Sequence, residues 1–304
     1  MSGVPFRSGF VSLVGRPNVG KSTLVNRLVG TKVSIVSSRP QTTRTQIRGV
    51  RTTERSQIVL LDTPGIHKPK TLLGERCNDR SVQTLGEVDV VCLLVEANTP
   101  IGGGDRFISQ LVHRARTAKI LVVNKVDAAG PADVVDHLAR AEALLGEFDA
   151  LVPVSARTGK GVEALVGELE ARLPEGPVYY PGGVVSDQPE TALVAELVRE
   201  KLLAVTHDEL PHSIVVTAEP LEEAEPLEEE PREDLLRYRV VIRVERDSQK
   251  GIVIGRGGLV LRDAGTKARI ELEALLGARV YLETRVKVDP DWQRRAHALD
   301  RLGL

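Results

Sequence analysis

The stretch GFVSLVGRPNVGKSTLVNRLV, residues 9–29, decides the fold of the amino-terminal half. Gly9–Val14 is a short apolar run rich in β-branched residues, as in a buried strand, and Leu24–Val29 has the pattern of a helix. The two glycines of the loop between them, Gly15 and Gly20, let its backbone N–H groups converge on phosphate oxygens, at the positive end of the helix dipole. The sequence therefore predicts a phosphate-binding loop between a strand and a helix.

Two side chains of this loop have predicted roles at the phosphates. We expect Lys21 to reach the β and γ oxygens and the Ser22 hydroxyl to bind Mg²⁺. The same loop occurs in ATPases and small-molecule kinases, so it leaves the base undecided. The nucleotide-binding candidates in the loop are Gly15, Arg16, Pro17, Asn18, Val19, Gly20, Lys21, Ser22 and Thr23.

A second string, NKVD at Asn124–Asp127, favours guanine. It follows the apolar run KILVV, so it lies at the carboxyl end of a predicted strand, where doubly wound sheets bind ligands. A carboxylate at Asp127 suits the N1–H and the exocyclic amine of guanine, whereas adenine offers an acceptor at N1 and no amine at C2. The predicted base site comprises Asn124, Lys125 and Asp127, with Ser155, Ala156 and Arg157 at its far edge.

Two polar segments between these strings are candidates for sensing the γ-phosphate: SSRPQTTRTQ at 37–46 and DTPGIHKPKTL at 62–72. In a G domain, a threonine of the first segment binds magnesium only while the γ-phosphate is present, and a glycine N–H of the second touches that phosphate. We expect Asp62 to hold Mg²⁺ through water and Gly65 to contact the γ-phosphate. The candidates in the second segment are Asp62, Thr63, Pro64, Gly65 and Ile66.

The four strings occur in the order that a guanine-nucleotide hydrolase requires. We therefore predict an α/β fold of the P-loop GTPase type, with a doubly wound, mostly parallel sheet. Ile66 stands where many signalling GTPases carry a glutamine that orients the attacking water, so we expect slow intrinsic hydrolysis.

Composition fits a two-domain cytosolic protein. The chain has 304 residues, a formal net charge of −1, and no apolar run near the roughly 18 residues of a membrane span. Cys77 and Cys92 are too few for a disulfide framework, so we expect reduced thiols and no disulfide partner, and the six histidines form no ligand pattern.

A second domain is predicted after a linker rich in proline and glycine. We place the G domain at residues 1–174, the linker at 175–189 and the second domain at 190–304. The second domain is expected to contain a helix at Leu193–Val205 and strands at Ser213–Ala218, Leu236–Arg246 and Ala278–Val288. The acidic stretch 219–234 is interpreted as a solvated hairpin loop that does not touch RNA phosphates, and an acidic tip that binds a partner is the alternative.

The run KGIVIGRGGLVLRDAGTK contains a GxxG loop at Gly255–Gly258, which we interpret as following an apolar strand end and preceding a long basic helix. In a KH domain such a loop lets the nucleic-acid backbone approach, and about four bases lie in an adjoining groove. A tight strand-to-helix turn is the alternative. The order helix, two strands, helix, strand is that of a type II KH domain, an α+β fold. The RNA-binding candidates are Lys250, Ile252, Ile254, Gly255, Arg256, Gly257, Gly258, Arg262 and Lys267.

The chain resembles the Era family over nearly its whole length. The strings that carry this resemblance are, in order, GRPNVGKSTLVNRL, the QTTR segment, DTPGIH, NKVD, VPVSA, the REKLL helix and VIGRGG. This resemblance implies a bacterial factor for 30S subunit maturation that binds single-stranded 16S rRNA near its 3′ end, with loose peripheral association with the inner membrane.

The resemblance to related bacterial GTPases also implies residue roles. It favours Thr43, which directly precedes an arginine, as the threonine that binds magnesium. The catalytic candidates are therefore Lys21, Thr43 and Gly65. The same resemblance makes Asn18 a candidate potassium ligand. The predicted cofactors are GTP or GDP, Mg²⁺ and K⁺, and the predicted state is a monomer. The long acidic stretch departs from the family pattern.

Three other functions remain open on the sequence alone. The first is a ribosome GTPase related to those with tandem G domains, acting on another RNA. The second is a non-switching RNA-binding protein that carries a structural nucleotide, and the third is a P-loop ATPase. Guanine preference and a measurable rate of phosphate release separate the last two from an RNA-binding GTPase switch.

Overall fold

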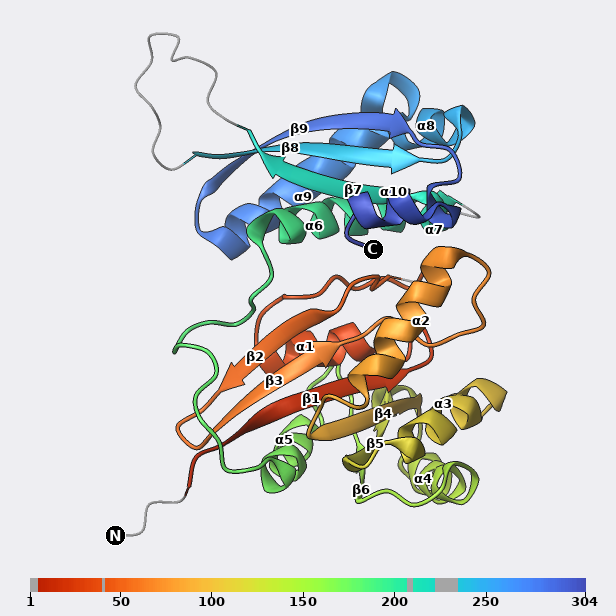
Figure 1. The fold of residues 1–304 in the computed structure, drawn as a ribbon, viewed down its shortest axis with the longest axis vertical. Coiled ribbons are helices and arrows are strands. Elements are labelled where there is room, and N and C mark those ends of the chain that lie inside the picture. Colours follow the sequence, from red (N-terminus) through yellow and green to blue (C-terminus); the bar gives the residue numbers. More distant parts are fainter. Residues whose placement is uncertain (1–4, 40–41, 207–209, 222–234) are drawn as a thin grey trace. The chain divides into compact units, whose positions relative to one another are not determined.

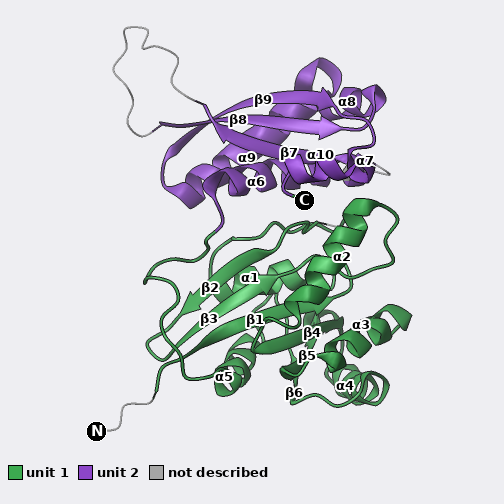
Figure 2. Cartoon of the chain, viewed as in Figure 1, with its two compact units in different colours: residues 1–187, 304 green, residues 188–303 purple. Residues whose placement is uncertain are grey.

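The computed structural model describes residues 5–39, 42–206, 210–221 and 235–304. The chain divides into two compact units, residues 1–187 with Leu304 and residues 188–303 (Figure 1, Figure 2). Most of the acidic stretch, residues 222–234, and Pro40 and Gln41 of the first polar segment lie outside the described residues.

Unit 1 has a six-stranded sheet in the order β2-β3-β1-β4-β5-β6, in which β2 is antiparallel to β3 and the other pairs are parallel. The predicted mostly parallel, doubly wound fold is therefore confirmed. The strands are β1 (Arg7–Gly15), β2 (Ile47–Thr52), β3 (Ser56–Asp62), β4 (Val90–Glu96), β5 (Ala118–Asn124) and β6 (Ala150–Pro153). The helices are α1 (Lys21–Val29), α2 (Leu72–Thr84), α3 (Gly103–Arg114), α4 (Pro131–Leu145) and α5 (Val162–Arg172), with a 3₁₀ turn η1 (Val126–Ala128).

Apolar side chains fill both faces of this sheet. On one face, side chains of α1 and α5, such as Leu24 and Leu169, pack with Val11 and Leu13 of β1. On the other face, side chains of α3 and α4 pack against β3, β4 and β5. Because the central strands are covered on both sides, they are nearly continuous runs of Val, Ile and Leu. The carboxyl ends of these strands carry the phosphate-binding loop, DTPG and NKVD to one edge of the sheet.

Residues 175–187, which the sequence analysis assigns to the linker, lie in unit 1. The Ser8 hydroxyl donates to the Pro177 carbonyl at 2.6 Å, and the Val50 N–H donates to the Val185 carbonyl at 2.9 Å. The Gln57 amide binds both the backbone N–H and the carbonyl of Tyr180. The segment is therefore held against β1, β3 and β2 by these hydrogen bonds.

Unit 2 has a three-stranded sheet in the order β7-β8-β9, with β7 antiparallel and β9 parallel to β8. This is the predicted α+β domain of KH type. Its strands are β7 (Val215–Pro220), β8 (Leu235–Val244) and β9 (Arg279–Val288). Its helical segments are α6 (Glu190–Val205), α7 (Leu210–Ser213), α8 (Asp247–Ile254), η2 (Arg256–Gly258), α9 (Leu259–Leu276), η3 (Trp292–Arg294) and α10 (Ala296–Arg301).

The interpretation of the residues before the GxxG loop as a strand end is wrong. Helix α8 occupies Asp247–Ile254, so the loop joins two helices. The Gln249 side-chain oxygen accepts from the N–H groups of Glu245 and Arg246, at 2.9 and 3.1 Å, and so caps the start of this helix just after β8 ends. A short apolar run such as GIVI has no periodicity that separates a strand from a helix.

The carboxyl-terminal segment packs on unit 2. Trp292 is fully buried, and its indole N–H donates to the Ser213 carbonyl at 2.9 Å. A tryptophan whose ring is buried and whose polar atom is satisfied inside the domain is a packing residue. Its side chain therefore stabilises unit 2 and offers no surface to a ligand.

Candidate nucleotide site and candidate RNA surface

The phosphate-binding loop follows β1 and ends at Lys21, the first residue of α1. Gly20 has a φ of 98°, and a Cβ at this position would lie 2.3 Å from the Asn124 amide nitrogen. Only glycine satisfies both conditions. A cavity of about 330 Å³ lies beside the loop. It is lined by the loop itself, by residues 35–38, and by Thr42, Thr43, Gly65 and Lys125. The cavity therefore brings together the predicted phosphate, magnesium and γ-phosphate groups.

Lys21 lines this cavity and is 6% exposed. Its ammonium donates to the carbonyls of Gly15 and Arg16, at 3.2 and 3.0 Å. Burial lowers the pKa of Lys21 to about 8, while the Asp62 carboxylate opposes this shift. A buried ammonium bonded to carbonyls is suited to exchange them for phosphate oxygens.

The oxygen ligands predicted for magnesium lie together. The hydroxyls of Ser22 and Thr43 are 3.1 Å apart, whereas the Thr42 hydroxyl donates to the Arg39 carbonyl. Asp62 is fully buried, and its Oδ1 has no hydrogen-bond partner among the described residues, although Oδ2 accepts from the Ser34 hydroxyl at 2.6 Å. Burial raises the pKa of Asp62, and the nearby hydroxyls oppose that shift. An unpartnered buried carboxylate oxygen beside two hydroxyls fits a hard cation with its water ligands.

The candidate base site is formed by the loops after β5 and β6. The Asn124 side chain donates to the Val19 carbonyl at 2.8 Å and accepts from the Ala156 N–H at 3.0 Å. Asp127 accepts from the Ser155 hydroxyl and pairs with Arg157, each at 2.5 Å. The Ser155 hydrogen bond is the main reason that the pKa of Asp127 is low. The carboxylate is thus held ionised and oriented, as recognition of guanine requires.

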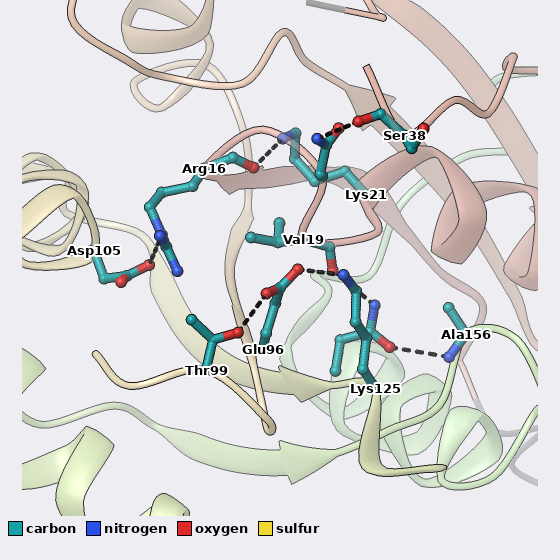
Figure 3. A network of polar contacts seen from close by, with 11 residues as sticks. Arg16, Val19, Lys21, Ser38, Glu96, Thr99, Asp105, Lys125 and Ala156 are labelled. Atoms are coloured by element: carbon teal, nitrogen blue, oxygen red, sulfur yellow. Dashed lines mark hydrogen bonds and ion pairs between the residues drawn. The ribbon is translucent and has the colours of Figure 1, made fainter. Parts of the chain in front are cut away.

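Two acidic residues that the sequence analysis did not find support this site (Figure 3). Glu96, at the end of β4, pairs with the Lys125 ammonium and accepts from the Thr99 hydroxyl at 2.8 Å. Asp105, buried at the start of α3, pairs with Arg16 at 2.7 Å and caps the helix by accepting from the Gly102 N–H. They belong to no motif and become visible only when the strand ends are brought together.

Backbone strain is concentrated at the same site. Among the described residues, three that are not glycine have a positive φ, and two of them are Asn18 and Lys125, each at 66°. The Asn18 amide donates to the Ser38 carbonyl at 2.6 Å, which links the phosphate loop to the first polar segment. A left-handed backbone conformation is unfavourable for any residue other than glycine, and it is retained where the surrounding structure and the function require it.

Two predicted candidates have their side chains turned away from the nucleotide cavity. Ile66 is 3% exposed and packs in the core between the sheet and α3, while its N–H donates to the Gly15 carbonyl at 3.3 Å. The Thr63 hydroxyl donates to the Leu13 carbonyl at 2.8 Å. Their side chains hold the DTPG segment on the sheet and offer no group to orient a water.

In unit 2, the GxxG turn joins α8 to α9. Gly255 has a φ of 72°, and a Cβ there would lie 2.4 Å from a Val260 methyl, so packing of the turn requires this glycine. At Gly258 a Cβ would meet nothing within 4 Å. The second outer glycine therefore faces open space, where a nucleic-acid backbone can approach.

Exposed apolar and basic side chains surround the turn. Ile252 and Leu259 are 56% and 61% exposed, and Leu259 is a surface residue that the sequence analysis did not include. Of the predicted RNA-binding residues, Lys250 and Ile254 are half-buried, and Arg256 and Arg262 are exposed. The Lys267 ammonium pairs with Asp263 at 2.8 Å. Apolar side chains for bases beside cations for phosphates are typical of a KH groove.

Comparisons with known proteins agree with this geometry. Residues 10–125 match a family described as 50S ribosome-binding GTPase, and residues 210–293 match the KH domain family. The chain is 49% identical over 300 residues to GTPase Era of Mycobacterium sp. (strain JLS), covering 98% of this chain and 99% of that protein. It is 50% identical over 301 residues to GTPase Era of Mycobacterium tuberculosis (strain ATCC 25177 / H37Ra), with the same coverage.

Two solved structures match the whole chain, each covering 98% of it and 99% of the other chain with a TM-score of 0.92. One is a single-substitution variant of Aquifex aeolicus Era bound to GDP·AlF4⁻, at 38% identity. The other is Era in complex with MgGDPNP and nucleotides 1506–1542 of 16S ribosomal RNA, at 39% identity. With the phosphate loop, the NKVD carboxylate and the KH turn in place, this chain belongs to the Era family of GTPases, which join a G domain to a KH domain.

Proposed function

We propose that this protein is a nucleotide-gated RNA clamp that binds the 3′ end of 16S rRNA through its KH domain and assists maturation of the 30S subunit. The observation that carries the proposal is the GxxG turn between α8 and α9, with open space at Gly258 and exposed Ile252 and Leu259 beside it. A relative with the same fold was solved with nucleotides 1506–1542 of 16S rRNA, which supports this choice of RNA.

The proposed gating is supported by contacts between the first polar segment and the phosphate loop. Thr43 and Ser38 of the first segment touch Ser22 and Asn18 of the phosphate loop. We expect the γ-phosphate to order residues 37–46 and 66–73, which then favour one placement of the KH domain, and hydrolysis to release it. RNA must in turn change GTP affinity, because coupling between binding sites is reciprocal.

Magnesium belongs to the proposed mechanism. Ser22 and Thr43 would bind it directly and Asp62 through water, and the ion would neutralise charge that develops on the transferred phosphoryl group. Lys21 would bind the β and γ oxygens, and the Gly65 N–H would contact the γ-phosphate. No side chain at position 66 orients the attacking water, so turnover is expected to be slow without an activator.

Potassium is the proposed additional cation, with Asn18 as its side-chain ligand. Asn18 already bridges the phosphate loop and the Ser38 carbonyl, so an ion beside it would have two kinds of oxygen ligand and would add positive charge near the phosphates. We expect faster GTP hydrolysis in potassium chloride than in sodium chloride at equal ionic strength. The Asn18→Ala variant should lose this difference, and equal turnover of the unmodified protein in the two salts would remove the proposal.

We assign nucleotide chemistry to residues 1–174, a connecting role to 175–189 and RNA binding to 190–304, in a monomer. We also propose a cytoplasmic protein with peripheral, loose membrane association. Within the described ranges, no helix is both long enough and apolar enough to cross a bilayer.

The RNA-binding part is tested by reversing charge at the GxxG turn. Arg256→Asp with Gly257→Asp puts two carboxylates where phosphates are expected, while Arg256→Asn with Gly257→Asn has nearly the same shape and adds no negative charge. We expect the first pair to weaken binding of a single-stranded 16S 3′-end RNA by about a hundredfold or more and the second by much less, because repulsion adds to the lost phosphate contacts. Filter binding measures this, and the fluorescence of Trp292, the single tryptophan of the sequence and buried in unit 2, serves as the folding control. Equal affinity of both variants and the unmodified protein would refute RNA binding at this turn.

A further inference from the structure

Helices α6, α8 and α9 cover one face of the unit 2 sheet. Helix α6 packs on β7, and α8 and α9 pack on β9 (Figure 1). Along β8 the even-numbered residues from Tyr238 to Val244 are buried against these helices. Successive side chains of a strand point to opposite faces, so the odd-numbered residues of β8 and β9 belong to the other face. On that face Val215 and Val241 are buried, whereas Arg285 and Lys287 are exposed, and we call it the open face for its exposed part.

Four cations gather on this open face around a depression of about 280 Å³: Arg239 and Arg243 of β8, and Arg285 and Lys287 of β9. We call them the open-face basic cluster. Arg243 lies directly opposite Lys287 in the strand register, and Arg285 lies opposite Val241. Arg285 and Lys287 are exposed and Arg243 is half-buried. The rest of the depression is lined by Thr217, Ala218, Glu219 and Val241.

The cluster is only partly neutralised within the protein. Glu283 is shared by Arg285 at 2.6 Å and Arg239 at 3.6 Å, and Glu219 also pairs with Arg239 at 3.4 Å. Arg243 donates to the Thr217 hydroxyl at 2.8 Å, and neither Arg243 nor Lys287 has an ion pair with a described carboxylate. Burial, followed by repulsion from Arg301, lowers the pKa of Arg243. Like charges directly opposite one another destabilise a sheet, and a bound polyanion removes that cost.

We infer that the open-face basic cluster binds the phosphate backbone of the same single-stranded RNA, at nucleotides that flank those held by the GxxG groove. This inference rests on the proposed RNA-binding function. Strand β9 is the edge of the sheet and α8 packs against it, so a strand that leaves the groove over this edge reaches Arg285 and Lys287. The lining of the depression contains no aromatic side chain on which a base could stack, among the residues that the structure describes there, which limits recognition to backbone charge.

The test compares RNA lengths. Unstructured 3′-end RNAs of about six and about sixteen nucleotides are bound to the full-length protein, since a KH groove holds about four bases. The variant is Arg285→Gln with Lys287→Gln, and the matched control is Arg114→Gln with Arg116→Gln, two exposed cations at the end of α3 and just after it. We expect the variant to bind the short RNA like the unmodified protein and the long RNA about tenfold more weakly. For the long RNA, the slope of the logarithm of the binding constant against the logarithm of salt concentration should become shallower by about 1.4, because two phosphate contacts to a single strand are lost.

Three results would overturn the inference. They are unchanged binding of both lengths by the variant, an equal loss of affinity for both lengths, and, with a third RNA in which the ten added nucleotides form a hairpin stem, a loss of affinity for that RNA alone. If the unmodified protein binds neither length, the proposed RNA-binding function itself fails, which is a different outcome. GTP turnover should stay unchanged in both variants, and the fluorescence of Trp292, the single tryptophan of the sequence and buried in unit 2, reports that unit 2 folds.

Discussion

Lys21→Ala is expected to lower the rate of GTP hydrolysis by about two to three orders of magnitude, the effect typical of losing one preorganised donor to a developing oxyanion. The ammonium is buried, bonded to the Gly15 and Arg16 carbonyls, and placed where the β and γ oxygens are expected to arrive. Its removal leaves charge on the transferred phosphoryl group without its main side-chain partner.

Single-turnover phosphate release, measured with saturating enzyme, separates this effect from weaker binding. Lys160→Ala, which removes an exposed lysine near the base loop, is the control and should behave like the unmodified protein. A Lys21→Ala protein that hydrolyses bound GTP within about threefold of the normal rate would show that the lysine only contributes to binding, since such a ratio is well under 1 kcal/mol of barrier.

Asp127→Asn should change the base that the protein prefers. The carboxamide replaces one acceptor by a donor, which meets the exocyclic amine of guanine donor to donor but matches the carbonyl that xanthine has at that carbon. We expect affinity for GDP to fall by about a hundredfold or more and affinity for xanthosine diphosphate to rise above it, because mispaired groups in a recognition site cost several kcal/mol.

Competition against a fluorescent nucleotide measures both affinities in one experiment. Asp127→Ala is the companion variant and should bind both bases weakly, since it retains neither oxygen. If Asp127→Asn still prefers the guanine nucleotide, the carboxylate is not what selects the base.

The nucleotide site is largely predictable from sequence because its chemistry lies in short contiguous strings. GRPNVGKS, DTPG and NKVD each end a buried strand, and parallel strands deliver their carboxyl ends to one edge. Glu96 and Asp105 escape such a prediction because their partners, Lys125 and Arg16, are distant in sequence, and no local pattern marks such a pair.

The KH domain is also predicted from sequence, except that the residues before the GxxG loop form a helix and not the end of a strand. Helix α8 resembles a strand end because its apolar residues are β-branched and few, so neither periodicity nor propensity decides. Gln249, whose side chain caps the start of that helix, is the available signal. The open-face basic cluster is not visible in sequence either, since its four cations alternate with core residues on two strands that meet only in the sheet.

The claim that nucleotide state controls RNA binding is tested most directly by the affinity of the full-length protein for the 16S 3′-end RNA with a non-hydrolysable GTP analogue and with GDP. We predict a difference of at least about fivefold, the lower end of ordinary allosteric coupling, and the same factor in nucleotide affinity with and without RNA. Equal RNA affinities in the two nucleotide states would contradict the account and leave two independent binding sites on one chain.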